Sequence, residues 1–452
     1  MKDIGKPERI CLIALALVVL VYLYWYGTGR RLREANTDMA RVDQGAYLHD
    51  AVKMYEVLHE GREFRSMGAQ GPLYPLLLSL AYTPDLTEEE YFERGKYVDV
   101  VLSLIILGCL FFVFKRHLPL LQSINLILVT SFAVYMFIAA AFHAEPLFYF
   151  LSFCTFLLLC TMLIKPSWKL GVLTGFVAGV TYLVKPSLLP ALGLFTLFSV
   201  AKIGGTLLAW LIKKPRTSFP FSRRDLAWRL LSIALVGIVF LGTVYPYLRS
   251  NKKVFGKPFY CVSTTFYMWY DSWEEVKQGT KAHGDRKGWP DMPSDQIPSL
   301  GKYLREHTVQ QIVYRMLNGF RILHQVAASS YGYYKYVAIN LVILIVLAIL
   351  NGRRSIEMVA KYPYLLLFCL AYFAAYLFAY AWYTPIASGN RFTLALFLPW
   401  MFATSYAIHT LPATCLPIRH FEVKLRDVLN VLVLLIFSFD VYAMLTERLL
   451  MM

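Results

Sequence analysis

Long apolar runs separated by short polar turns occupy most of the chain. The first run covers residues 10–26 and the last covers residues 427–445. A helix needs roughly 18 or more apolar residues to cross a bilayer. The alternating polar and apolar positions of membrane barrel strands are absent from these runs. The pattern therefore predicts an all-α polytopic membrane protein.

Runs that approach or exceed this length predict about eleven spans. They cover residues 10–26, 97–114, 120–141, 147–164, 169–184, 188–203, 229–247, 336–350, 362–381, 392–410 and 427–445. We expect residues 1–452 to form a single membrane-embedded domain. Residues 27–96 would form a first extracytoplasmic loop with interfacial helices, including the short segment 71–82. Residues 248–334 would form an extracytoplasmic helical cap.

Charge places the loops on the two sides of the membrane. Only 16% of the residues are charged, and the net charge of +16 lies mainly in short loops. The most basic loop, residues 202–229, is predicted to be cytoplasmic by the positive-inside rule. The N-terminus is then cytoplasmic, with residues 10–26 as a retained signal anchor. The cations indicate contact with the lipid bilayer and not with nucleic acid.

The stretch 36–58 carries the most informative pattern. From about Asp43 its apolar positions recur at helical spacing and form one face. These positions are Tyr47, Ala51, Met54 or Tyr55, and Leu58. Asp43 and Asp50 lie on or beside that face, where a carboxylate is costly unless it is paired or used. Asp43 serves either as a helix N-cap or as a functional carboxylate.

Ionisable residues gather at the extracytoplasmic ends of the predicted spans. They are Asp38, Asp43, Asp50, His143, Glu145, Lys185 and Arg391. Ionisable groups at membrane depth are functional candidates by default. Lys185 and Arg391 could hold a lipid phosphate, and a first-loop carboxylate could accept a proton from a hydroxyl. The site would then face the periplasm, the extracellular space or a lumen.

Each of these residues also has a structural alternative. Lys185 could be a lysine that reaches the interface beside its helix, and Arg391 a helix-end anchor. His143 and Glu145 are weak candidates for ligands of a divalent metal, because two ligands do not complete a site. Aromatic residues such as Tyr74, Trp382 and Tyr383 are more often part of an interfacial belt than platforms for a sugar.

Five segments of the chain and Arg94 form a series of short motifs. The segments are Arg41-Val-Asp43-Gln44-Gly-Ala-Tyr47-Leu, Gly71-Pro-Leu-Tyr74-Pro-Leu, Ala144-Glu145-Pro146-Leu-Phe, the glycine-rich run 171–186 that ends in Lys185-Pro186, and Asn390-Arg391-Phe392 with Leu398-Pro399. In this order they resemble the motifs of the GT-C glycosyltransferases that use polyprenyl-phosphate sugars, among them protein O-mannosyltransferases and the lipid A aminoarabinose transferase. Arg94 resembles the arginine that opens a span in that family.

The resemblance implies a GT-C-like bundle and specific residue roles. Asp43 would be the general base of an inverting transfer, with Asp38 as a rival, and Lys185 and Arg391 would contact the donor phosphate. Tyr47, Asp50, Tyr74, His143 and Glu145 would be candidate pocket residues. The partners implied are a polyprenyl-phosphate-linked sugar donor and a hydroxyl acceptor on a lipid, glycan or protein. The chain departs from the family pattern at Gln44, where relatives carry a second acidic residue, and at Gln70-Gly71, where many carry a basic residue or His before Pro.

Two other functions fit the same pattern. A transporter or flippase for a lipid-linked or anionic substrate would place ionisable residues near the bilayer midplane on broken spans. A glycan polymerase or ligase would share the lipid donor and would need a large acceptor groove in the external excursion.

Overall fold

The computed structural model describes residues 6–41, 43–212, 223–283, 292–412, 415–418 and 421–450. Helices make up nearly all of the secondary structure in these residues. Within them, eight helical segments are long and apolar enough to cross a membrane. The prediction of an all-helical polytopic protein is therefore confirmed, apart from one short hairpin described below.

Each of these eight candidate spans overlaps a span predicted from the sequence. They are Glu88–His117 (α4), Leu120–Ile138 (α5 Leu120–Thr130, η1 Ser131–Tyr135 and α6 Met136–Ile138), Glu145–Ile164 (α7), Pro186–Leu208 (η2 Pro186–Leu188 and most of α9 Leu189–Ile212), Leu226–Phe255 (within α10 Arg223–Phe255), Tyr333–Leu350 (α15), Pro363–Tyr383 (α17) and Leu425–Thr446 (α20).

The other three predicted spans are helical but differ in detail. Residues 10–26 lie within α1 (Lys6–Glu34), and residues 169–184 form α8 (Trp168–Val184), which has 17 residues. Residues 392–410 divide into α18 (Asn390–Ala395) and α19 (Phe397–Thr410). Pro399 explains the division, because a proline fits the first turn of a new helix but not a helix interior.

The sequence analysis did not predict the antiparallel pairing of β1 (Cys415–Ile418) with β2 (Phe421–Lys424). Residues 213–222, in the basic loop predicted at 202–229, lie outside the described residues, as do residues 284–291 of the predicted cap.

The described cap and loop helices are α2 (Gln44–His59), α3 (Leu73–Ser79), α11 (Val262–Thr265), η3 (Tyr267–Trp269), α12 (Trp273–His283), α13 (Leu300–Glu306), α14 (Val309–Ser329) and α16 (Gly352–Lys361).

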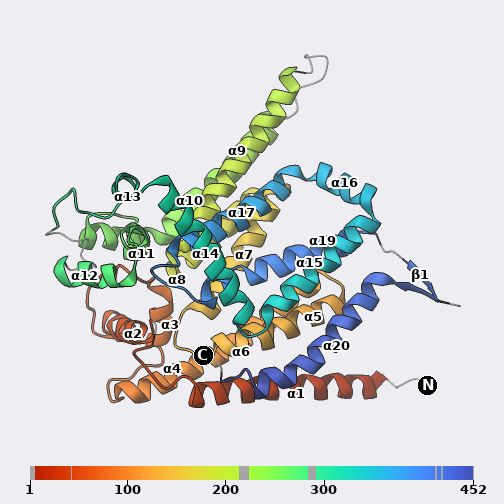
Figure 1. The fold of residues 1–452 in the computed structure, drawn as a ribbon, viewed down its shortest axis with the longest axis horizontal. Coiled ribbons are helices and arrows are strands. Elements are labelled where there is room, and N and C mark those ends of the chain that lie inside the picture. The colour runs from red at the N-terminus through yellow and green to blue at the C-terminus, as the bar shows by residue number, and fades with distance from the viewer. Residues whose placement is uncertain are drawn as a thin grey trace.

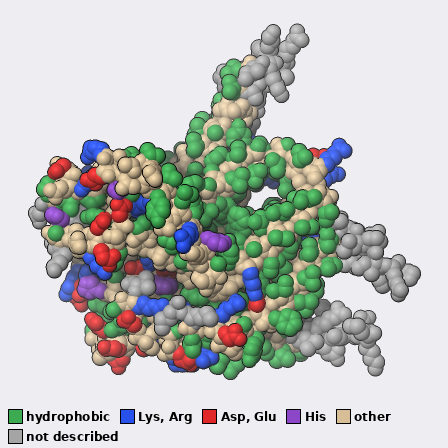
Figure 2. Space-filling model, in the orientation of Figure 1, with side chains coloured by type: hydrophobic (Ala, Val, Ile, Leu, Met, Phe, Trp, Pro, Cys, Tyr) green, Lys and Arg blue, Asp and Glu red, His purple; other side chains and the backbone are tan. Residues whose placement is uncertain are grey.

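The helices divide the molecule into a charged end and an apolar body. The first-loop and cap helices α2, α3, α11, α12 and α13 gather at one end of the bundle, away from α16 and the hairpin (Figure 1). Figure 2 shows charged side chains concentrated at that end and hydrophobic side chains over the rest of the visible face. Outward-facing Phe112, Ile349 and Phe439 are strongly exposed. Such a surface is stable in contact with lipid and not with water.

The glycine-rich helix α8 packs closely against α10. A Cβ atom at Gly171 would lie 2.5 Å from the carbonyl oxygen of Ser232, and one at Gly175 would lie 2.6 Å from that of Val236. Small residues let two membrane helices approach at backbone distance. This close packing fixes the helix whose end carries Lys185.

Replacing Gly175 by Val is therefore expected to destabilise the bundle. Forcing extra atoms into a packed core costs about 1–3 kcal/mol, and contact with rigid backbone puts this site at the upper end. Thermal unfolding of the purified protein in detergent measures the effect. Gly193→Val in α9 is the matched control, because a Cβ there meets nothing within 4 Å. Equal melting temperatures for the two variants would contradict the close packing.

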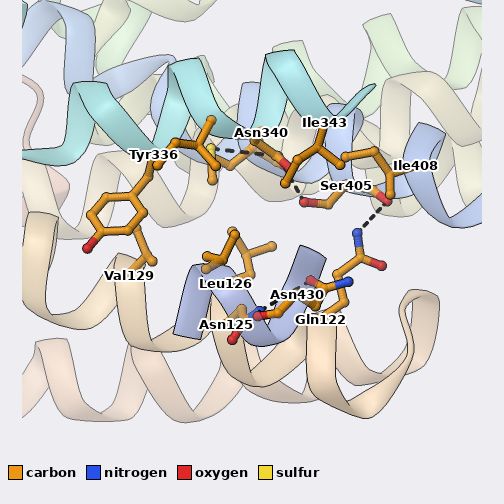
Figure 3. Close-up of a pocket in the computed structure, with 13 residues that line it drawn as sticks. Gln122, Asn125, Leu126, Val129, Tyr336, Asn340, Ile343, Ser405, Ile408 and Asn430 are labelled. Carbon is orange, nitrogen blue, oxygen red and sulfur yellow. Dashed lines mark hydrogen bonds between the residues drawn. The ribbon is translucent and has the colours of Figure 1, made fainter. Parts of the chain in front are cut away.

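A small cavity of about 30 Å³ lies between α5, α15, α19 and α20 (Figure 3). Neutral side chains join the helices around it. Asn340 donates to Ser405 Oγ (3.1 Å), Gln122 donates to the Ser405 carbonyl (2.8 Å), and Asn125 donates to the Asn430 carbonyl (2.7 Å). Interhelical hydrogen bonds in membranes contribute about 0.6–2 kcal/mol each. These amides stabilise the bundle, whereas the charged candidates lie at its end.

Candidate functional site

Helix α2 has the predicted extent and the predicted face. Tyr47, Ala51 and Met54 are buried, and Leu58 at the far end is exposed. Asp43 occupies the N-cap position, but its side chain makes no capping hydrogen bond. The capping alternative is therefore wrong for the carboxylate, which contacts a residue far away in the sequence.

That residue is Arg391, in the first turn of α18. Nη1 of Arg391 donates to Oδ2 of Asp43 at 2.7 Å, and the side chains are 27% and 43% exposed, respectively. The hydroxyl of Tyr149 donates to the Arg391 carbonyl at 2.7 Å and fixes the backbone. Burial lowers the pKa of Arg391, but attraction to Asp43 and Glu145 outweighs burial and raises it. The pair thus joins the first loop to α18, near the C-terminal end of the chain.

A second ion pair lies beside the first. Glu145 opens α7 and is fully buried, and Lys185 follows the last residue of α8. Nζ of Lys185 donates to Oε1 of Glu145 at 2.6 Å. Nδ1 of His143 lies 3.2 Å from Oε2 of Glu145, without hydrogen-bond geometry. Burial lowers the pKa of His143, and Lys185 and Arg391 add to this effect, while Glu145 and Asp43 oppose it.

The structure therefore brings together five of the candidates in one charge cluster: Asp43, His143, Glu145, Lys185 and Arg391. Asp38 is exposed, and its Oδ1 accepts from the Ala40 amide at 2.9 Å in a local turn. Asp50 is buried further along α2. Tyr74 is also buried, so it packs inside the protein and is not part of an exposed aromatic belt.

Gln44, the departure from the family pattern, clamps the loop that carries Asp43. Its amide exchanges two hydrogen bonds with Asn36, at 2.8 and 2.9 Å, and its Oε1 also accepts from the Phe142 amide at 2.8 Å. Nζ of Lys96 donates to the Asn36 carbonyl at 3.0 Å. A carboxylate at position 44 has no N–H to donate to Asn36. Gln44 thus positions α2 against the turn before α7.

Gly71 belongs to the second departure from the family pattern, the pair Gln70-Gly71. A Cβ atom there would lie 2.1 Å from the carbonyl oxygen of Leu183, near the end of α8. Only glycine allows this approach. The turn before α3 therefore packs directly against the helix end that presents Lys185.

Sequence analysis missed a buried carboxylate, Asp99 of α4. The hydroxyl of Tyr74 donates to Oδ2 of Asp99 at 2.6 Å, while Oδ1 has no hydrogen-bond partner in the described residues. The ring of Tyr74 meets that of Tyr47 edge-on at 4.9 Å. An aspartate inside an apolar span was a visible signal. Asp99 thus holds Tyr74 in place, and Tyr74 packs against Tyr47 of α2.

A cavity of about 190 Å³ opens beside the charge cluster. Arg391, His143 and Glu145 line it, together with Arg31 and Arg41, which sequence analysis did not select. Arg31 is buried, and its guanidinium donates to the carbonyls of Phe137 and Leu449. Three arginines against one carboxylate make the walls suited to an anionic group.

A metal ion finds few ligands here. In the part of the chain that the structure describes, no group of three or more His, Cys, Asp or Glu side chains is arranged to hold one. Glu145 accepts from Lys185, which competes with any cation for that carboxylate. The hypothesis of a metal at His143 and Glu145 therefore gains no support from the geometry.

No family model matches the chain, and no curated protein matches it. A solved structure does match, that of ArnT from Cupriavidus metallidurans bound to undecaprenyl phosphate. The match covers 86% of this chain and 77% of that chain, at 12% sequence identity and a TM-score of 0.33.

Acidification is expected to destabilise the wild-type protein more than the His143→Gln variant. Burial lowers the pKa of His143 in the folded state. The unfolded chain therefore takes up the proton first, near the ordinary value of about 6.5. Stability is retained above that pH and falls as the pH drops toward the lower folded pKa. Melting temperatures from about pH 7.5 to about pH 5 measure the difference, and parallel curves would contradict it.

Proposed function

We propose that this protein is an integral membrane glycosyltransferase. It would move a sugar from a polyprenyl-phosphate donor to a hydroxyl acceptor on the extracytoplasmic face, with inversion at the sugar carbon. The observation that carries the proposal is the Asp43–Arg391 pair beside an arginine-lined cavity. Two carboxylates, Asp43 and Glu145, and several cations then meet at the end of the bundle, where a lipid phosphate would lie at headgroup level.

Asp43 is assigned the role of general base. Its carboxylate is partly exposed, and α2 and the Asn36–Gln44 clamp hold it at the end of a fixed helix. It would take the proton from the acceptor hydroxyl while the oxygen attacks the sugar carbon opposite the phosphate. A positioned base of this kind contributes about 10²–10⁴-fold to the rate.

Arg391 is assigned the principal contact to the donor phosphate, because it lines the cavity. Phosphate would compete with Asp43 for the guanidinium, so donor binding would release the carboxylate for its role as a base. Lys185 is bonded to Glu145 and is not among the cavity-lining residues. Its positive charge would therefore act on the phosphate at a distance, without direct contact. Fixed cations stabilise the charge that develops on a departing phosphate.

Binding of undecaprenyl phosphate, used as a polyprenyl-phosphate probe, tests the proposal. Native mass spectrometry of the protein in detergent should show the lipid bound to wild type and bound about tenfold or more weakly to Arg391→Ala. Arg353→Ala is the control, because Arg353 lies on α16 at the opposite end and is exposed. Equal affinities in the two variants would remove the assigned phosphate contact.

A structure with the same lipid separates the proposal from its main rival. Phosphate beside Arg391, with Asp43 facing the same cavity, would support transfer chemistry. A lipid in mid-bilayer along a path open to both sides would instead indicate a transporter or flippase. Release of polyprenyl phosphate from a panel of polyprenyl-phosphate sugars would then identify the donor sugar.

A further inference from the structure

The cap contains a second and larger cavity, of about 490 Å³. It lies between α12, α13 and the segment that leads into α12, and it falls within the range of about 300–1,000 Å³ typical of small-molecule sites. Its walls combine aromatic rings with side chains that both donate and accept hydrogen bonds. They include Trp269, Tyr270, Tyr303, Gln278, Gln296 and Glu275.

Most of the charged groups around this cavity have a charged partner, whereas Glu275 accepts from the Asp271 amide at 3.0 Å. Asp271 accepts from Arg315 at 2.9 Å and lies 2.6 Å from Nε2 of His307. Lys302 lies 3.8 Å from Glu306. A pocket whose cations are paired with carboxylates favours a neutral polar ligand over an anion. Amide and carboxylate groups beside aromatic faces suit a ligand with many hydroxyl groups and apolar C–H faces, which is the chemistry of a sugar.

The cap cavity and the charge cluster are joined by aromatic contacts. The rings of Trp269 and Tyr303 lie 6.0 and 5.0 Å from that of Trp382, at the end of α17. Arg315 stacks on Trp382 at 4.4 Å and donates to its carbonyl at 3.1 Å. Trp382 and its neighbour Tyr383 therefore tie the cap to the bundle.

Tyr383 continues the connection toward the charge cluster. Its ring meets that of Phe392 at 6.0 Å, and the guanidinium of Arg391 lies 5.2 Å from the same Phe392 ring. The rings of Trp382, Tyr383 and Phe392 thus lie between the cap cavity and the cation assigned to the donor phosphate. An acceptor bound in the cap would reach the site of transfer with a part of its chain that extends past these rings.

We propose that the cap cavity binds the glycan part of the acceptor, so that the acceptor is a neutral, polyhydroxylated sugar chain or a molecule that carries one. This inference rests on the proposed transferase function. The aromatic wall at Trp269 and Tyr303 would take the apolar face of a sugar ring. Gln278 and Gln296 would hydrogen-bond its hydroxyl groups.

An array of neutral oligosaccharides, probed with the labelled full-length protein in detergent, tests the inference without any donor. Wild type should retain one or more glycans, and Trp269→Ala and Gln278→Ala should each weaken that retention by about tenfold. Gln278 is an exposed residue of α12, so its truncation leaves the packing intact. Melting temperature and undecaprenyl phosphate binding check the fold of each variant.

Arg391→Ala separates this inference from the proposed function, because it should keep glycan binding and lose lipid binding. Retention of no glycan by wild type, or equal retention by wild type and both cap variants, would overturn the inference. Loss of glycan binding in Arg391→Ala would also overturn it, by moving the glycan to the charge cluster. Glycan binding in the cap without lipid binding in wild type would instead contradict the proposed function.

Discussion

Asp43→Asn is expected to reduce the rate of sugar transfer by about 10²–10⁴-fold, the contribution of a positioned general base. The amide keeps the shape of the side chain but cannot accept the proton. The fold should persist, because the partly exposed pair with Arg391 contributes only about 0–1 kcal/mol. Donor affinity should not fall, since Arg391 loses a competitor for the phosphate. Turnover, melting temperature and undecaprenyl phosphate binding measure these three effects separately.

Asp38→Asn is the matched control for this prediction. Asp38 is the rival base in the sequence, yet its carboxylate is exposed and bonds the Ala40 amide in its own turn. We expect this variant to retain wild-type turnover. Full activity in Asp43→Asn together with a large loss in Asp38→Asn would transfer the assigned role to Asp38.

Glu145→Gln is expected to cause the largest loss of stability among the site variants. Removing one partner of a buried ion pair costs about 3–5 kcal/mol, because the other charge remains without compensation. Glu145 is fully buried and Lys185 is 25% exposed, which places the loss near the lower limit of about 3 kcal/mol. The neutral amide also removes the negative charge beside His143. Thermal unfolding in detergent measures the effect.

An exposed ion pair of the same length provides the control. Lys253 and Glu63 lie 2.6 Å apart, as Lys185 and Glu145 do, but both are well exposed. Exposed pairs contribute about 0–1 kcal/mol, so Glu63→Gln should change the melting temperature little. Similar losses in Glu63→Gln and Glu145→Gln would show that burial does not govern the strength of the Glu145–Lys185 pair.

The sequence predicted helices well because membrane spans are set by a local property. Apolar length alone determines where a helix can cross a bilayer, and each of the eight candidate spans overlaps a predicted one. The division at Leu396 was missed because apolar length says nothing about backbone breaks. The hairpin at 415–424 was missed because two four-residue strands give too short a pattern.

The site was only partly accessible to sequence reasoning. The pattern of ionisable residues at span ends selected Asp43, Glu145 and Arg391, which the structure brings together, since charge at membrane depth is rare enough to be informative. Arg31 and Arg41 were missed because they follow a span in a loop rich in charge, where nothing local separates a cavity wall from a topology signal. The sequence also did not predict which residues pair with each other, such as Asp43 with Arg391 and Glu145 with Lys185.

The sequence by itself determined the helical, multi-span architecture and the amphipathic helix after Asp43. Periodicity and apolar length each act within a few turns of chain. Only the tertiary structure decided that Asp43 meets Arg391, 348 positions away, and that Glu145 meets Lys185. Those contacts depend on how helices distant in sequence pack side by side, and no local pattern records that packing.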